Sequence, residues 1–155
     1  MKLSKKSRYG ITALIDLSIN SKSGHVSLSS IAERNDISPQ YLEQVFAGLR
    51  RYGIVKSIKG AQGGYLLNKP AEKIAVGEII EALDGTYRIE DDVTGNEEEE
   101  RVADRIIKES VIDIINDQLD NVLLNITLAD LEKDYLEYNA TDDQMYYICL
   151  LYTSD

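Results

Sequence analysis

Cysteine and aromatic residues other than tyrosine are scarce in this chain of 155 residues, which has one cysteine, Cys149, one phenylalanine and no tryptophan. A single thiol excludes a disulfide framework and any all-cysteine metal site within one chain. Long apolar runs are also missing, so no membrane span is expected. The apolar stretch behind the basic N-terminus is interrupted by Asp16 and Asn20, which argues against a signal peptide. We therefore expect a cytoplasmic protein.

The sequence patterns of catalysis are absent too. We find no nucleophile–base pair, no cluster of metal ligands and no phosphate-binding loop. The glycines Gly60, Gly63 and Gly64 lack the spacing of a P-loop and its Lys-Ser/Thr ending. The single histidine, His25, lies in a turn, where we expect a structural or solvent-facing side chain and assign it no chemistry. We therefore predict that the protein is not an enzyme.

Negative charge dominates the chain as a whole, with a formal net charge of −10 at pH 7, but it is unevenly distributed. Residues 1–70 hold 11 Lys+Arg and 4 Asp+Glu, a balance of +7. Residues 71–155 hold 6 Lys+Arg and 23 Asp+Glu, a balance of −17. Such asymmetry suggests that the two halves have different functions, and the basic half is suited to binding a polyanion.

The basic half shows helical periodicity. We predict one helix over 6–20, a second that starts at the N-cap Ser27, and a third that starts at Ser38. In the third, Pro39 takes the first helical position and Gly53 ends the helix. Its apolar stripe has the spacing i, i+3, i+4, i+7 and consists of Leu42, Val45, Phe46 and Leu49.

A glycine-tipped hairpin follows, with short strands expected at 55–59 and 65–67. Two helices, a tight turn, a third helix and a hairpin are the order of a winged helix-turn-helix, in which the hairpin is the wing. A short helix within 76–85 completes this part of the chain. The predicted fold is therefore mainly α with a small β-hairpin, and the winged helix-turn-helix DNA-binding domain is placed at 1–85.

The acidic half predicts a long helix with an uncovered face. Residues 86–100 form an acidic loop, and the pattern from about 98 to 126 is that of an amphipathic helix. About 25 residues of helix span about 38 Å, too long for the small head to cover, so a second copy of the chain is the simplest partner. We assign 101–148 to this dimerisation helix and a C-terminal tail, in which Thr127 caps a last short helix. The predicted dimerisation residues are Ile107, Val111, Ile114, Ile115, Leu119, Val122 and Leu123.

The second helix of a helix-turn-helix enters the major groove, where its N-terminal residues meet base edges. Outside the apolar stripe, this helix presents glutamines that can bond adenine and Glu43, which can accept from cytosine. Basic residues suit the phosphates, and the wing glycines let main-chain atoms approach them. The predicted phosphate or groove contacts are Lys5, Lys6, Arg8, Ser38, Gln40, Gln44, Arg50, Arg51, Lys56, Gly63 and Gly64.

Each of these residues also has a structural alternative. Tyr41 could be half-buried packing, and Arg50 and Arg51 could form a solvated helix end that matches the dipole. For any one residue the two interpretations weigh about equally. Spacing, charge and element order together favour DNA binding. A winged-helix module that binds only protein is the alternative function.

Four strings resemble the Rrf2 family of bacterial winged-helix transcription regulators: SRYGITALIDL, SLSSIAERNDIS, YLEQVFAGLRRYGIVKSIKGAQGGYLL and ITLADL. The resemblance is strong over 1–85 and looser over the long helix. It implies a homodimeric repressor on a partly palindromic double-stranded DNA operator, with base readout by Tyr41, Glu43 and Lys59. Relatives usually carry arginine at the wing position, and lysine loses the bidentate fork to guanine.

The segment 86–105, TYRIEDDVTGNEEEERVADR, departs from the cluster-binding members of that family, which carry three cysteines there. We therefore expect no iron–sulfur cluster and no other cofactor. This favours the cysteine-metabolism repressor branch, whose implied partner is O-acetylserine sulfhydrylase (cysteine synthase), and the string QMYYI resembles that branch's C-terminus. Residues 149–155, CLLYTSD, resemble translated sequencing-adapter sequence, so we expect a non-native tail there, with a genuine redox cysteine as the alternative.

Overall fold

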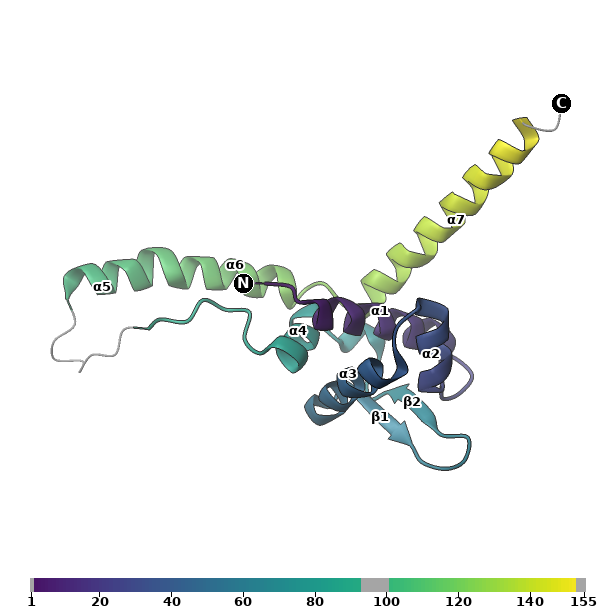
Figure 1. Ribbon diagram of the computed structural model, residues 1–155. Coiled ribbons are helices and arrows are strands. Elements are labelled where there is room, and N and C mark those ends of the chain that lie inside the picture. The colour runs from purple at the N-terminus through teal and green to yellow at the C-terminus, as the bar shows by residue number, and fades with distance from the viewer. Residues whose placement is uncertain (1, 93–100, 153–155) are drawn as a thin grey trace.

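Two helical arms diverge from a small head that carries the hairpin, as Figure 1 shows. The computed structural model describes residues 2–92 and 101–152. The elements of the head are α1 (Lys5–Asn20), α2 (Leu28–Asn35), α3 (Pro39–Tyr52), β1 (Val55–Ile58), β2 (Gly64–Leu67), a 3-10 turn (Ala71–Lys73) and α4 (Val76–Asp84). The first arm consists of α5 (Val102–Ile107), a π-helical segment (Lys108–Ile112) and α6 (Asp113–Leu123), and the second arm is α7 (Leu128–Tyr152). The predicted winged-helix fold is confirmed.

The helices of the head start and end where capping chemistry predicts. The hydroxyls of Ser27 and Ser38 each accept a hydrogen bond from the backbone N–H three residues further on, at 3.2 and 3.4 Å. Pro39 lies in the first turn of α3, and Gly53 ends that helix in the left-handed conformation, with φ 89°. Asp36 adopts the same conformation, with φ 51°, in the turn between α2 and α3. Asp36, Ser38 and Pro39 thus form the tight turn between α2 and α3, the two helices of the helix-turn-helix.

The apolar stripe of α3 is the centre of the core. Leu42, Val45, Phe46 and Leu49 have no exposed surface, and α1, α2, α4 and β1 all pack against this helix. The ring of Phe46 meets Tyr65 of β2 edge to face, with centroids 4.8 Å apart. The wing is therefore built into the core and does not hang from it as a separate loop.

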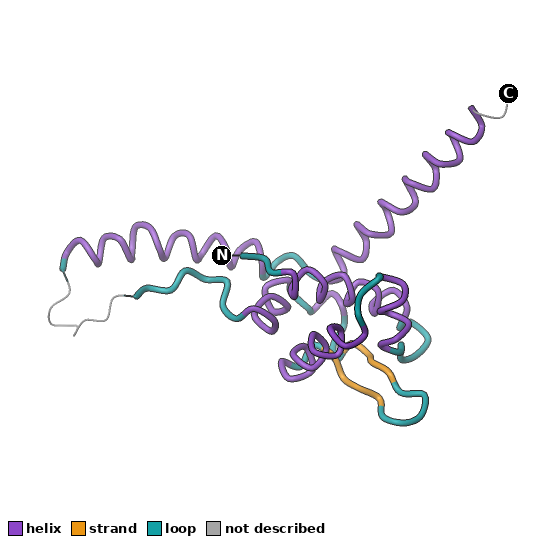
Figure 2. Tube along the Cα trace, in the orientation of Figure 1, coloured by secondary structure: helices purple, strands orange, loops and turns teal. Residues whose placement is uncertain are grey.

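The wing is an antiparallel hairpin in which Val55 pairs with Leu67 and Ile58 with Gly64, drawn as the two orange strands of Figure 2. Strand β2 also pairs with Val26, a residue of the segment before α2. Val26 donates to the Tyr65 carbonyl at 3.0 Å and accepts from the Tyr65 N–H at 2.8 Å. The strand positions agree with the prediction to within one residue, and the extra bridge fixes the wing to the start of the helix-turn-helix.

The first arm confirms a long helix after the acidic loop, with one irregularity. The helical path from Val102 to Leu123 contains a π-helical turn over Lys108–Ile112. A π-turn adds one residue to a helical turn and rotates the faces on either side of it relative to each other. The predicted start near residue 98 lies outside the described residues.

The second arm corrects one expectation, because α7 is a helix of 25 residues and not a short one. Its start was predicted correctly: Thr127 Oγ1 accepts from the Asp130 N–H at 3.2 Å, and the Asp130 carboxylate accepts from the Thr127 N–H at 2.9 Å. Apolar residues of α7 are not gathered on one face. Periodicity therefore gave no signal for how far the helix extends.

The chain returns to the head between the two arms. The Val76 N–H donates to the Ile126 carbonyl and the Leu128 N–H to the Ile74 carbonyl, both at 2.8 Å, and Leu128 is completely buried in the core. The base of α7 is also tied to α1, where Ser18 donates to the Glu132 carboxylate at 2.5 Å. Residues near 128 therefore contribute to the head that the sequence analysis placed at 1–85, and the predicted boundaries stay a prediction.

The described part of the predicted acidic loop, residues 86–92, is held along α6. The buried amide of Asn116 donates to the Ile89 carbonyl at 3.0 Å and accepts from the Ile89 N–H at 2.8 Å. The Tyr87 hydroxyl donates to Asp120 at 2.8 Å, and Arg88 pairs with the same carboxylate. Burial, together with the bond to Asp120, raises the pKa of Tyr87 to about 12. This part of the loop is thus attached to the first arm.

Candidate nucleic-acid interface

The outer face of α3 is polar and exposed. Gln40, Glu43 and Gln44 all point away from the core and have no partner within the described chain. Ser38 is exposed as well, although its oxygen already caps the helix. Two amides and one carboxylate in the first turns of a helix can hydrogen-bond to the edges of bases. The structure therefore brings together most of the predicted α3 contacts on one surface.

Tyr41 lies differently, because it is half-buried. Its ring meets Tyr9 of α1 edge to face, with centroids 5.6 Å apart, and packs against the core. The ammonium of Lys5 lies 5.3 Å from the centre of the Tyr9 ring, within the range of a cation–π contact. Packing uses part of the Tyr41 surface, and base readout by this residue stays a prediction. The same contacts place Lys5 at the edge of the α3 surface.

The wing presents two exposed lysines, Lys56 and Lys59, next to α3. The packing of the protein itself requires glycine at two positions of the wing. A β-carbon on Gly63 would come within 2.5 Å of the Ile58 carbonyl oxygen, and one on Gly64 within 2.5 Å of the Val26 carbonyl oxygen. The hairpin needs these glycines for its own close backbone approach. Their contact with DNA stays a prediction.

His25 holds the tip of the wing, a structural role of the kind that the sequence analysis expected, through a contact that it did not predict. Its Nε2 donates to the carbonyl of Gln62, 37 residues further along the chain, at 2.5 Å. The neighbouring Val26 pairs with the wing strand, so two successive residues anchor the hairpin. No spacing pattern links a histidine in a turn to a distant carbonyl, and the sequence therefore offered no signal for this contact.

The basic residues of the described chain differ in whether they form ion pairs. The cations that form ion pairs lie outside the predicted interface: Lys22, Arg34, Lys69, Arg88, Arg101 and Lys108. Within the described part of the chain, no ion pair with a carboxylate is formed by Lys5, Arg8, Arg50, Arg51, Lys56 and Lys59. These cations are exposed on α1, α3 and the wing, and an outside anion would meet no competing carboxylate.

Lys6 is an intermediate case, because it is half-buried beside the end of α4. The Asp84 carboxylate there accepts hydrogen bonds from the hydroxyls of Ser4 and Ser7, both at 2.5 Å. Partial burial alone would raise the pKa of Asp84, but these hydrogen bonds, with the charge of Lys6, hold it below its ordinary value. Part of the Lys6 charge is therefore already balanced, and its phosphate contact stays a prediction.

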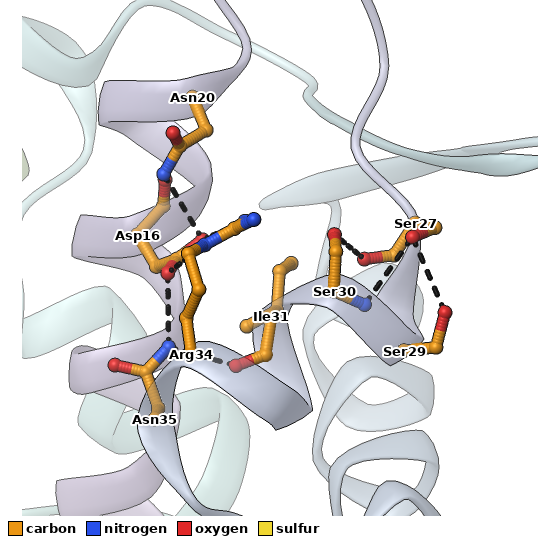
Figure 3. Close-up of polar contacts among 8 residues, drawn as sticks. All are labelled: Asp16, Asn20, Ser27, Ser29, Ser30, Ile31, Arg34 and Asn35. Atoms are coloured by element: carbon orange, nitrogen blue, oxygen red, sulfur yellow. Dashed lines mark hydrogen bonds and ion pairs between the residues drawn. The ribbon is translucent and has the colours of Figure 1, made fainter.

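A buried carboxylate fixes α2 against α1, as Figure 3 shows. Asp16 accepts from Arg34 Nε at 2.9 Å and Nη2 at 2.7 Å, and from the Asn35 amide at 2.9 Å. The two-bond fork of a guanidinium on a carboxylate has a fixed geometry. Hydrogen bonding to Asp16 raises the pKa of Arg34 and keeps it charged. This contact holds α2, the first helix of the helix-turn-helix, in place against α1.

Most of the predicted dimerisation stripe is open to solvent on the first arm. The exposed fractions are 50% for Ile107, 47% for Val111, 53% for Ile114, 40% for Ile115 and 51% for Val122. Leu123 differs, because it is buried with Val76, Ile80 and Tyr87 of its own chain, and Leu119 packs against the same cluster. These two leucines have little surface to offer a partner, and the interface itself stays a prediction.

No helix in the described ranges is long and apolar enough to cross a bilayer. Across 2–92 and 101–152, no group of three or more His, Cys, Asp or Glu side chains is arranged to hold a metal ion.

Comparison with known proteins gives the family. A family model described as "Iron-dependent Transcriptional regulator" (Rrf2) matches residues 3–134. The HTH-type transcriptional regulator IscR of Cronobacter sakazakii is 40% identical over 146 residues, 93% of this chain and 88% of that protein. The regulator matches confirm the prediction that the chain is not an enzyme, and they support a DNA-binding regulator over a winged-helix module that binds only protein.

Solved structures agree on the fold. CymR (YrzC), described as the global cysteine regulator of B. subtilis, is 41% identical with a TM-score of 0.68, over 86% of this chain and 97% of that one. IscR of T. potens is 40% identical with a TM-score of 0.64, over 87% of this chain and 88% of that one.

Proposed function

The chain belongs to the Rrf2 family of DNA-binding transcriptional regulators, and we propose that it acts as a homodimeric repressor on a partly palindromic DNA operator. In this proposal α3 enters the major groove and the wing follows the adjacent backbone. The head at 1–85 binds DNA, the acidic loop at 86–100 connects it to the arm, and 101–148 supplies the dimerisation helix and tail.

One observation carries the proposal: six exposed cations on α3 itself and on its neighbours α1 and the wing form no ion pair with a carboxylate of the described chain. A protein with net charge −10 has abundant carboxylates, and they do pair with cations elsewhere on its surface. Keeping the charges of α1, α3 and the wing unpaired favours a polyanionic partner.

Specificity is assigned to exposed side chains that can read base edges. Glu43 accepts from a cytosine amino group, Gln40 and Gln44 bond adenine, and Lys59 donates to a guanine from the wing. Tyr41 contributes its exposed edge. Arg8, Arg50 and Arg51 contact phosphates, which carry affinity without sequence information.

The homodimer rests on the first arm. An isolated protein rarely leaves several large apolar side chains of one helical arm, such as Val111, Ile114 and Val122, exposed to water. A second copy offers the same stripe in the opposite direction under two-fold symmetry. Two heads joined in this way would reach two half-sites of a palindromic operator.

We propose that the protein works without an iron–sulfur cluster, although its family is described as iron-dependent. Thiolates hold such clusters. Residues 86–105 contain no cysteine, and the one cysteine, Cys149, is exposed far along α7. These donors do not fit a thiolate-held cluster. Anaerobic incubation with iron and sulfide should leave no protein-bound visible absorption, and a stable coloured species would contradict this.

Control of cysteine or sulfur metabolism is the target that we propose, because CymR of B. subtilis is described as a global cysteine regulator. O-acetylserine sulfhydrylase as the sensing partner stays a prediction from the family resemblance. Size-exclusion chromatography of the two purified proteins, with and without O-acetylserine, tests it. Separate elution under both conditions would end this part of the proposal.

In vitro selection of bound DNA is the experiment that tests the main proposal. Wild type should select one palindromic motif. Glu43→Ala should relax preference at one base pair of each half-site, by about 1–3 kcal/mol. Arg51→Ala is the matched control on the same helix and should weaken all sequences alike. An unchanged motif in Glu43→Ala would remove base readout from that residue.

Salt dependence tests the electrostatic part separately. Because phosphate binding releases counterions, affinity should fall about ten-fold or more between about 50 and 200 mM salt. Arg51→Ala should lower the slope of log affinity against log salt by about one for each subunit, and so by about two for the dimer. A protein that shows no DNA binding at low salt would contradict the proposal as a whole.

A further inference from the structure

A pocket of about 430 Å³ lies where α1 and α2 meet the base of α7. Its floor is the polar cluster of Asp16, Arg34 and Asn35, whose side chains are drawn in Figure 3. Its apolar lining comes from both sides, from Ile15 and Ile19 on α1 and from Tyr135 and Leu136 on α7, and the polar residues Thr12, Asn20 and Asn139 line it as well. A concave apolar site with a few convergent polar groups is the usual form of a small-molecule site.

The hydrogen bonds that Asp16 and Arg34 already make determine whether the pocket suits a ligand that donates or one that accepts hydrogen bonds. Asp16 is saturated, because its two oxygens accept from Arg34 twice, from Asn35 and, at 3.3 Å, from Asn20. An amine ligand would find no free acceptor on this carboxylate. Arg34 is not saturated: a guanidinium has five N–H donors, and two of them go to Asp16.

The remaining N–H groups of Arg34 have no acceptor within the described residues, and the side chain is 42% exposed. Their planar arrangement matches a carboxylate, which can accept two parallel hydrogen bonds. Asp16 balances part of the charge of this guanidinium, so the remaining N–H groups would hold a carboxylate through charge-assisted hydrogen bonds and not through an unpaired positive charge. The pocket thus offers donors at one end and apolar surface at the other.

We propose that this pocket binds a small monocarboxylate with an apolar body, and that the ligand acts as an effector of DNA binding. The carboxylate bonds the free edge of Arg34, and the apolar body lies between Ile15, Ile19 and the α7 side chains. A bound ligand bridges α2, the first helix of the helix-turn-helix, to α7. Because α2 packs on α3, its position affects the surface that meets DNA.

The test uses 3-phenylpropanoate as the probe and its neutral amide, 3-phenylpropanamide, as the matched ligand, by isothermal titration calorimetry on the full chain. For a ligand of this size we expect a Kd on the order of 1 mM for the acid. The amide should bind at least about ten-fold more weakly, because it loses the charged hydrogen bonds. Equal binding of acid and amide would overturn the assignment to Arg34.

Leu136→Trp should fill the pocket and abolish binding of the acid. Tyr138→Trp is the control, since it adds the same side chain to the same helix at a residue that is 74% exposed and does not line the pocket. Unchanged binding in Leu136→Trp would overturn the site. So would a Leu136→Trp protein that has become monomeric where the wild type is dimeric, because the pocket would then belong to a subunit contact.

The effector role has its own readout. Saturating 3-phenylpropanoate should change the affinity of the wild type for its selected DNA at least about three-fold, and should leave Leu136→Trp unaffected. Binding of the acid with no change in DNA affinity would overturn the effector role. The calorimetric result does not depend on DNA, so its failure is distinguishable from failure of the proposed function.

Discussion

Two helical segments of this protein carry the same kind of apolar stripe and end in opposite environments. On α3, Leu42, Val45, Phe46 and Leu49 are fully buried by their own chain. On the first arm, Ile107 and Ile114 are half exposed. Their spacing is alike, so periodicity shows which face of a helix must be covered but not what covers it.

Length and position explain the difference. The 14 residues of α3 are packed between α1, α4 and the hairpin, whereas the first arm leaves the head and touches it at one end only. Near that end the arm turns a second strip, Asn116 and Leu123, to its own subunit. The first arm therefore has an inner strip that packs on its own subunit and an outer apolar strip that is open to solvent, while α3 has one buried face and one exposed polar face.

The largest expected effect comes from breaking the buried stripe. Phe46→Ala should lower the free energy of unfolding by about 3–5 kcal/mol, because it opens a cavity between α3 and the wing. Ile107→Ala on the arm should leave the unfolding of the head unchanged within about 0.5 kcal/mol. Urea titration at low protein concentration measures both. Similar losses for the two variants would show that the stripes are not in different environments.

Ile114→Asp should break the exposed stripe without unfolding the head. A charge placed between subunits without a partner should raise the dimer dissociation constant at least about 100-fold. Sedimentation velocity measures this, and Ile114→Met, which keeps an apolar side chain of similar volume, is the control. Leu119→Asp is a poorer test, since Leu119 also packs on its own head. A stable Ile114→Asp dimer would place the interface elsewhere.

Sequence patterns identified the elements whose signals are local. Ser27, Ser38 and Gly53 mark helix ends through contacts within a few residues, and the α3 stripe is a property of one helix. The length of α7 escaped, because its apolar residues follow no single face. The contacts of His25 and Asn116 escaped too, since each joins segments far apart in the chain. Long-range polar contacts leave no periodic trace.

The candidate interface likewise has features that follow from local sequence and features that depend on long-range contacts. Exposure of Glu43, Arg50 and Arg51 followed from the helical wheel of α3 and was predictable. The packing of Tyr41 on Tyr9 depends on how α1 crosses α3, which no single helix encodes. The split of cations into paired and unpaired groups likewise needed three dimensions.

His25→Ala should have a moderate effect that is confined to the wing. Losing the bond to the Gln62 carbonyl loosens the wing tip, and we expect about a three- to ten-fold loss of DNA affinity, in line with one hydrogen bond. Fluorescence anisotropy at fixed salt measures it. Ser23→Ala in the same turn is the control and should have no effect. Equal affinity of His25→Ala and wild type would limit His25 to packing.

The smallest expected effect is a pH-dependent contribution of one carboxyl group, Glu78, to the stability of the head. Burial alone would raise the pKa of Glu78, but hydrogen bonds from Lys69 at 2.7 Å and from the Ala75 N–H at 2.8 Å lower it below its ordinary value. A carboxyl with a depressed pKa in the folded state adds stability above its unfolded pKa, about 4.3 for Glu. That contribution disappears as the pH falls through the lower folded value.

Glu78→Gln should therefore lower the free energy of unfolding of the head by about 0.5–1 kcal/mol at neutral pH, and the difference from wild type should shrink below about pH 4. On the arm, Lys108 and Asp113 form a pair with both side chains over 40% exposed, where water screens the charges. Asp113→Asn should have little effect on the stability at neutral pH, because this exposed pair contributes little. Urea titrations between about pH 3 and pH 7 compare the two variants. A Glu78→Gln deficit that persists at the acid end would mean that packing of the side chain, and not its charge, stabilises the start of α4.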